Sequence, residues 1–328
     1  MRNKILSIMA FTVFAQAIFG QNYKLEKPLI FKPQEQKVLL FNKNSQSKKL
    51  ILYYSKLRVN TDGTRKSYHP DDLDGTKNFA INSICNGIAV YKLPDDKNKL
   101  ACSEAKVLFK KFQNNNWVPL PGYKISWDSV ISKNKDGKPC IFQNGEFKGY
   151  FGSETAVKNK LPLAERGECG YKNQLDSLQI PNLVLPAEFW KDSSQVIHRN
   201  PLFIFEAKKE DLVFAYNPEN GVWSYAIIGD VGPNDNLGEG SVSLNMKLLK
   251  KTDFPKNYPE AKKEIDTGNI KILVAIIPHS HSLMTKIAKP YTKENIEKRG
   301  RELLKEMGFN DEQSFIKFLK EQQSKFLE

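Results

Sequence analysis

Most apolar residues of this chain lie in short segments that are separated by turn signals. Asn220-Gly221 and Asp136-Gly137 are two such signals, and both favour tight turns between neighbouring strands. Segments of this length suit strands better than helices, which need longer periodic runs. The candidate strands are Lys37–Phe41, Leu50–Leu57, Gly87–Leu93, Leu183–Leu185, Leu212–Tyr216, Val222–Ile228 and the fully apolar Ile270–Ile277. We therefore predict a mainly β fold with some α, built around a β-barrel-like core, with a sandwich as the alternative.

Helical periodicity appears inside the β-rich region and again near the C-terminus. Ser103 to Phe112 place their apolar residues on one face, which predicts a helix there. Beyond Pro290, Ile296 and Leu303 keep a helical spacing, and Gly308 is a natural stop.

A second C-terminal helix is expected after Gly308. Asn310 with Gln313 resembles a capping box that would open it. Its apolar face would hold Phe315 and Phe318. We expect this helical C-terminal extension to pack on the β core.

The N-terminus has the parts of a secretory signal peptide. Arg2 and Lys4 precede the apolar run Ile5–Phe14, and Gly20-Gln21 follows as a cleavage junction. The run is too short for a stable membrane span, with an uncleaved anchor as the alternative. We expect a secreted or periplasmic protein that has no transmembrane span after signal removal. The expected organisation is a signal peptide at 1–20, a basic extension at 21–66, a β-rich domain at 67–280 and a helical tail at 281–328.

The cysteines fit an oxidising compartment. Cys85, Cys102, Cys140 and Cys169 are an even number, so disulfides are the default outside the cytoplasm. Three pairings are open, and the short loops favour Cys85–Cys102 with Cys140–Cys169. No CxxC spacing occurs, which argues against a structural zinc site or a redox pair.

The charge of the chain is high but unevenly distributed. Lys and Arg total 50 against 37 Asp and Glu, a formal net charge of +13. Nucleic acid is a poor partner for an exported chain that has no helix-turn-helix or zinc-finger pattern. Between Glu206 and Glu239, acidic residues far outnumber basic ones. An acidic cleft in a basic protein can still bind a cationic ligand, because exposed charges beyond about 10 Å are screened.

The segment 225–244 is the most informative for chemistry. A strand ends at Gly229-Asp230, a loop of Gly, Pro and Asn follows, and the chain resumes at Gly238-Glu239 with an alternating apolar run. This pattern predicts that Asp230 and Glu239 lie at the same rim of a sheet. Two carboxylates on a rigid rim suffice for glycoside hydrolysis. The alternative is that both are solvated turn residues.

Other residues are candidates for substrate binding. Asp72 and Asp74 could join the same acidic rim, and pyranose rings stack on aromatic faces such as those of Trp223, Tyr225 and Tyr150. Core packing is the alternative for each aromatic residue. His279 and His281 have chelating spacing but lack a third ligand, so we expect a surface loop and no metal site.

The chain resembles the glycoside hydrolase family 75 chitosanases over roughly residues 67–250. In that family a Gly-Asp that ends a strand is followed by a Gly-Glu that leads into a Ser-containing strand, as Gly229-Asp230 and Gly238-Glu239 do here. Further segments occur in the same order. They are Asp72-Leu73-Asp74-Gly75, Gly149–Ala156, Ile180–Pro186 and Asp211–Asn217.

The resemblance implies an activity. It implies a catalytic domain, placed here at 67–280, that cleaves β-1,4-glucosaminidic bonds in the interior of a polysaccharide, with inversion and without a cofactor. The essential carboxylates of the family correspond to Asp230 and Glu239, and we expect Glu239 to be the general acid and Asp230 the general base. Residues 21–66 and those beyond about 255 have no counterpart in the family, which puts chitosan itself in question.

Two alternatives stay open at this stage. A fold can be reused without its chemistry, so the chain could be a non-catalytic cell-envelope protein that binds carbohydrate. It could also hydrolyse another amino-sugar polymer, such as the glycan of peptidoglycan. In each case we expect a monomer whose partner is a polysaccharide.

Overall fold

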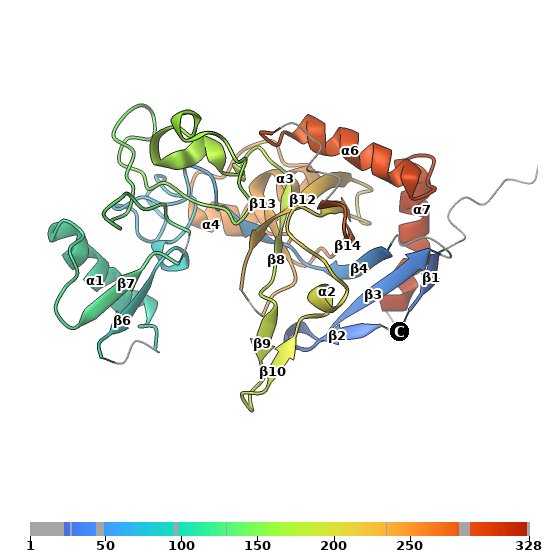
Figure 1. Cartoon of the computed structure of the whole chain (residues 1–328), viewed down its shortest axis with the longest axis horizontal. Coiled ribbons are helices and arrows are strands. Elements are labelled where there is room, and N and C mark those ends of the chain that lie inside the picture. The colour runs from blue at the N-terminus through green and yellow to red at the C-terminus, as the bar shows by residue number, and fades with distance from the viewer. Residues whose placement is uncertain are drawn as a thin grey trace, which may run out of the picture.

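The structure is a computed structural model, and it describes residues 23–26, 28–43, 49–94, 98–128, 130–233, 235–281 and 289–326. The predicted signal peptide lies outside these residues. Within them, no helix has both the length and the apolar character that crossing a membrane requires. The fold is a mixed α/β structure with one large sheet, a smaller module at one end and helices at the other (Figure 1).

The large sheet has ten strands, in the order β1-β3-β4-β14-β11-β12-β8-β13-β5, with β2 also paired to β3. The strands are β1 (Tyr23–Leu25), β2 (Leu29–Phe31), β3 (Gln36–Lys43), β4 (Lys49–Ser55), β5 (Arg58–Asn60), β8 (Asn182–Leu185), β11 (Leu212–Tyr216), β12 (Trp223–Val231), β13 (Glu239–Ser241) and β14 (Ile272–Ile277). Most neighbours are antiparallel, but β12 with β8 and β13 with β5 are parallel. The segment predicted to be a basic extension therefore supplies five strands to this sheet.

The sheet is open, so the predicted barrel is wrong. In the described part of the chain, β1 and β5 lie at opposite ends of the strand order and do not pair. The physical reason is visible in β11 and β14, which are buried along their whole length. Strands that are apolar on both faces belong to a sheet that is covered on both sides, and such a sheet need not close to protect its core.

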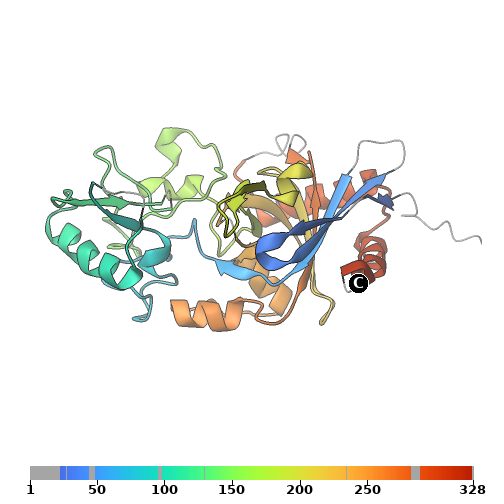
Figure 2. The same cartoon turned by 90° about the horizontal axis from the view of Figure 1, so that it is seen from below.

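Two apolar layers cover the two faces of the sheet. On one face, Tyr225 and Ile227 of β12 pack with residues of α6 (Lys293–Glu306) and α7 (Glu312–Gln323). On the other face, Ala226 and Ile228 pack with residues of α2 (Pro201–Ile204), α3 (Val242–Leu249) and the hairpin β9 (Phe189–Lys191) and β10 (Ile197–Arg199). The two C-terminal helices expected from the sequence are thus present, and they lie over the sheet (Figures 1 and 2).

Two local expectations were wrong in detail. The alternating run after Ser241 forms helix α3 rather than a strand, because the Ser241 hydroxyl accepts a hydrogen bond from the Leu244 N–H and caps a helix. The capping box of α7 is Asp311 with Ser314, one position after the expected pair, since Ser314 can reciprocate the bond from Asp311.

The smaller module has its own apolar core, which lies away from the C-terminal helices (Figure 2). It contains α1 (Cys102–Asn114), which matches the expected helix, and the hairpin β6 (Ala89–Lys92) with β7 (Tyr123–Ser126). Both favoured disulfides, Cys85–Cys102 and Cys140–Cys169, are confirmed. Cys85–Cys102 ties a short 3₁₀ turn, Ile84–Asn86, to the first residue of α1, and Cys140–Cys169 ties a loop to the 3₁₀ segment Glu168–Asn173. Cross-links of this kind stabilise a fold by limiting the entropy of the unfolded chain.

Candidate active site

Strand β8 brings Asp230 and Glu239 to the same end of the sheet. On one side of β8, Asp230 is the register partner of Val184. On the other side, Gly240 is the partner of Leu183, so Glu239 also lies opposite Val184. Register partners point to the same face, and each neighbouring strand lies about 4.8 Å away. The two backbones are therefore at most about 10 Å apart, and both side chains project from one face.

A bulge in β12 sets the direction of Asp230. The register shifts between Ile228 and Asp230, which leaves Gly229 without a partner. A Cβ atom on Gly229 would lie 2.6 Å from the Asn182 Cβ, so only glycine fits. Bulges re-aim the side chain that follows them. Here the bulge moves Asp230 away from the face that Ile228 occupies.

Asp230 is almost fully buried and well supplied with hydrogen-bond donors. It is 7% exposed. Its Oδ1 accepts hydrogen bonds from the N–H groups of Ala156 (2.8 Å) and Val231 (2.9 Å), and its Oδ2 accepts one from the Asn60 side chain (3.3 Å). Burial raises the pKa of Asp230, and these donors oppose the rise.

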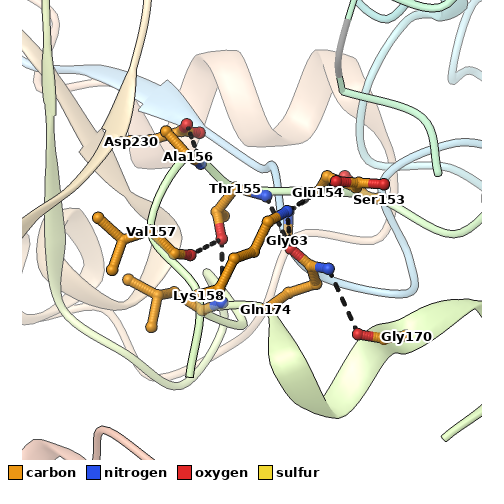
Figure 3. Close-up of polar contacts among 11 residues, drawn as sticks. Gly63, Ser153, Glu154, Thr155, Ala156, Val157, Lys158, Gly170, Gln174 and Asp230 are labelled. Atoms are coloured by element: carbon orange, nitrogen blue, oxygen red, sulfur yellow. Dashed lines mark hydrogen bonds and ion pairs between the residues drawn. The ribbon is translucent and has the colours of Figure 1, made fainter. Parts of the chain in front are cut away.

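The segment that holds Ala156 against Asp230 is itself fixed by side chains (Figure 3). Gln174 accepts a hydrogen bond from the Thr155 N–H at 3.0 Å and one from the Lys158 ammonium at 2.6 Å. Lys158 also pairs with Glu154 at 2.7 Å. The segment around Ala156 thus positions a backbone donor for Asp230.

Glu239 begins β13 and is partly buried beside the backbone of Gly232. A Cβ on Gly232 would lie 3.2 Å from the Glu239 Oε2. The Asn236 side chain donates to Oε1 at 3.3 Å. Burial raises the pKa of Glu239 from 4.5 to about 7, and the negative charges of Asp230 and Asp235 add to the rise. Glu239 is therefore a carboxyl group that keeps its proton in mildly acidic solution.

A third carboxylate, Asp62, belongs to the same cluster and was missed from the sequence. It lies two residues after the end of β5 and is partly exposed. Its Oδ1 accepts the Tyr68 hydroxyl hydrogen at 2.9 Å. Burial raises the pKa of Asp62 well above its ordinary value, and the charges of Asp230 and Glu239 raise it further. The Asp62-Gly63 turn signal directly after a strand pattern was the clue available in the sequence.

A groove of about 870 Å³ runs past Asp62 and Glu239. It lies between the β5–β13 end of the sheet, loops of the smaller module and the turn that begins at α4 (Tyr258–Glu260). Besides the two carboxylates, its lining includes Arg58, Asn60, Asn82, Asn86, Lys99, Asp128, Pro233, Tyr258, Lys262 and Asp266. Asp230 does not line the groove. It lies behind the groove and contacts it through Asn60.

The aspartates predicted to bind substrate lie elsewhere. Asp72 is 1% exposed. Its two carboxylate oxygens accept hydrogen bonds from four backbone N–H groups, those of Thr76, Lys77, Phe79 and Ala80. A carboxylate with these partners stabilises the turn that follows it. Asp74 forms an ion pair with Lys106 of α1 on the surface. Neither residue lines the groove.

The aromatic candidates are also outside the groove. Trp223 and Tyr225 pack around Phe214 on the face that α6 and α7 cover, because alternate residues of β12 point that way. The Tyr150 ring packs on the His69 ring in the smaller module, with centroids 4.7 Å apart. Packing against neighbouring rings, rather than a ligand, accounts for the burial of Tyr225.

The histidine pair that follows β14 has protein partners. His281 shares a hydrogen bond with Asp211 at 3.0 Å, and His279 lies 3.1 Å from Glu206. In the described part of the chain, no group of three His, Cys, Asp or Glu side chains is placed to hold a metal ion.

Comparison with known proteins adds no assignment. No protein-family model matches the sequence, and no curated protein matches it.

Proposed function

We propose that the protein is an inverting glycoside hydrolase that cleaves β-1,4-linked glucosamine polymers, in the manner of the chitosanases. The observation that carries this proposal is the carboxylate cluster in the groove. The pKa of Glu239 is raised to about 7, and Glu239 faces a groove that Asp62 also lines, with Asp230 directly behind. The charges of Asp230 and Glu239 raise the pKa of Asp62, which opposes ionisation of all three groups at once. A neutral carboxyl group beside an ionised one is the pair that glycosidic cleavage requires.

The two groups have separate tasks. Glu239, when protonated, gives its proton to the glycosidic oxygen as the bond to the anomeric carbon breaks. An ionised member of the Asp62–Asp230 pair takes a proton from the attacking water. Inverting enzymes leave about 6.5–9.5 Å between the two carboxyl groups to hold that water. The placement of Asp230 and Glu239 on opposite sides of β8 is compatible with such a separation.

The charge of the groove favours an amino sugar. Lys99 pairs with Asp128 at 3.4 Å. Burial raises the pKa of Asp266, and the nearby charges of Lys262 and Arg58 oppose that rise. Asp62 lies near the negative charges of Asp230 and Glu239, and Glu239 lies near Arg58 as well as Asp230 and Asp235. Among the described residues, the hydrogen-bond donors to Asp62 and Glu239 are the uncharged Tyr68 and Asn236. A protonated glucosamine would supply the missing positive charge, although the protein as a whole is basic.

We also propose that the protein works outside the cytoplasm. Two disulfides in the smaller module support this location, because they persist in an oxidising compartment. The N-terminal charge and apolar pattern supports it independently.

The experiment compares polymers and variants. The purified protein is incubated with partially acetylated chitosans, with chitin and with purified cell wall, and new reducing ends are measured. We expect release from chitosan that Glu239→Gln abolishes and Glu321→Gln, an exposed glutamate on α7, leaves unchanged. Release only from cell wall would redirect the proposal to peptidoglycan, and binding without release from any polymer would support a carbohydrate-binding protein instead.

A further inference from the structure

The groove contains a carboxylate that the chitosanase resemblance does not assign. We propose that Asp62, and not Asp230, is the catalytic base that faces the substrate, and that Asp230 is a positioning residue that acts through Asn60. This inference rests on the proposed hydrolase function and names the groups that carry it out.

Asp62 is accessible from the groove. Asp62 lines the groove together with Glu239. Tyr68 occupies the Asp62 Oδ1, and no hydrogen bond to Oδ2 is found among the described residues. That oxygen can accept a hydrogen from a water molecule in the groove. A general base must be within hydrogen-bond reach of the proton it removes.

Asp230 is not accessible to groove water in the same way. Two backbone N–H groups, of Ala156 and Val231, occupy its Oδ1, and the Asn60 amide donates to Oδ2. The side chain is 7% exposed and lies outside the groove lining. The Oδ2 atom of Asp230 could accept one more hydrogen bond, but the burial of the side chain behind the groove lining keeps groove water away from it.

Asn60 connects the two aspartates. Its Nδ2 donates to the Asp230 Oδ2 at 3.3 Å, and its Oδ1 accepts the N–H of Asp62 at 2.6 Å. Because both the nitrogen and the oxygen of the Asn60 amide are hydrogen-bonded, the amide has one orientation. Asn60 therefore links Asp230 to the backbone from which Asp62 projects. Burial raises the pKa of Asp62 and repulsion from Asp230 raises it further, which makes Asp62 a stronger base once it is ionised.

The remaining contacts of Asp62 and of its neighbour also fix its position. The Asn82 amide donates to the Tyr68 hydroxyl oxygen at 3.0 Å, so the hydroxyl hydrogen is directed to Asp62. The next residue, Gly63, has a φ of +87°, and a Cβ there would lie 2.2 Å from the Leu175 carbonyl oxygen. Only glycine allows this turn, and its N–H is held by Ser153 at 3.1 Å. Asp62 is thus held rigidly at the groove.

The reaction step is as follows. The water oxygen bonds to the anomeric carbon while Asp62 takes one of its protons. The bond from that carbon to the glycosidic oxygen breaks, and Glu239 gives its proton to the departing oxygen. Asp62 ends protonated and Glu239 ionised, and exchange with solvent restores both. The new hydroxyl group has the inverted configuration.

Azide rescue distinguishes a base from a positioning residue. Truncation of the base to alanine leaves room for azide, which bonds to the anomeric carbon without any proton removal, while Glu239 still protonates the leaving oxygen. We expect Asp62→Ala to lower kcat by about 10²- to 10⁴-fold with little change in KM. Added azide should restore turnover and give a glycosyl azide of inverted configuration, detected by mass spectrometry and NMR. Asp136→Ala, at an exposed turn of the smaller module, is the matched control and should behave like the wild type.

Asp230→Ala tests the other assignment. We expect a loss of turnover that azide does not restore. Rescue of Asp230→Ala but not of Asp62→Ala would overturn the proposal. If Asp230→Ala does not fold, Asp230→Asn keeps the Oδ1 acceptor, and its loss of kcat should be smaller than that of Asp62→Asn; the reverse order would also overturn it. A wild-type protein that hydrolyses none of the polymers would contradict the proposed function itself, before Asp62 is tested.

Discussion

Replacement of Glu239 by glutamine should stabilise the protein at alkaline pH while it removes activity. In the unfolded chain Glu239 ionises with a pKa near 4.5, but burial raises its pKa to about 7 in the fold. At about 1.4 kcal/mol per pKa unit, the folded protein loses about 3 kcal/mol as the pH rises between these two values. Below the lower value the group is neutral in both states and the loss is absent. Glutamine has the shape of the neutral acid and never carries the charge.

The measurement is the denaturation midpoint of the wild type and of Glu239→Gln at about pH 4 and about pH 8. We expect equal stability at the lower pH and a variant that is more stable by up to about 3 kcal/mol at the higher pH. Glu321→Gln, on the exposed face of α7, is the control and should show no such pH-dependent gain. If the two proteins are equally stable at both pH values, Glu239 is not held in a desolvated site and the reasoning fails.

Three further predictions concern the scaffold. Replacement of Cys140 and Cys169 by serine should lower the free energy of unfolding by about 2–4 kcal/mol, because it removes their disulfide. The melting temperature should fall accordingly, and an unchanged melting temperature would contradict this expectation. Asp72→Ala should destabilise the fold by about 3 kcal/mol in urea without changing KM, since it leaves buried N–H groups unpaired, and a selective rise in KM would return Asp72 to the substrate site. Gly300→Ala should cost about 1–3 kcal/mol, because its Cβ would lie 2.3 Å from Tyr225 and push α6 off the sheet, and a neutral effect would show that the tail packs loosely.

The sequence predicted individual elements better than their arrangement. β11 and β14 could be recognised because short, fully apolar runs are typical of buried strands. Whether such strands close into a barrel depends on which strands pair at the ends of the sheet, and local pattern contains no information on that. The run after Ser241 alternates like a strand, yet a single serine cap at the N-terminus was sufficient for a helix.

The candidate site was predictable only in part. Asp230 and Glu239 are close in sequence, and the loop between them predicted their proximity. Asp62 comes from a segment far away in the chain, and it reaches the site only because β5 pairs in parallel with β13. The aromatic residues of β12 lie away from the groove for a related reason, since α6 and α7 cover the face on which they project. Long-range pairing and coverage by distant helices decide both results.

The central claim is that the groove carboxylates hydrolyse a glycosidic bond with inversion. The most direct measurement is proton NMR of the first products from chitosan oligomers, recorded before the anomers equilibrate. The account predicts the α-anomer at the new reducing end for the wild-type protein and no product for Glu239→Gln. An initial β-anomer, or wild-type turnover in Glu239→Gln, would contradict it.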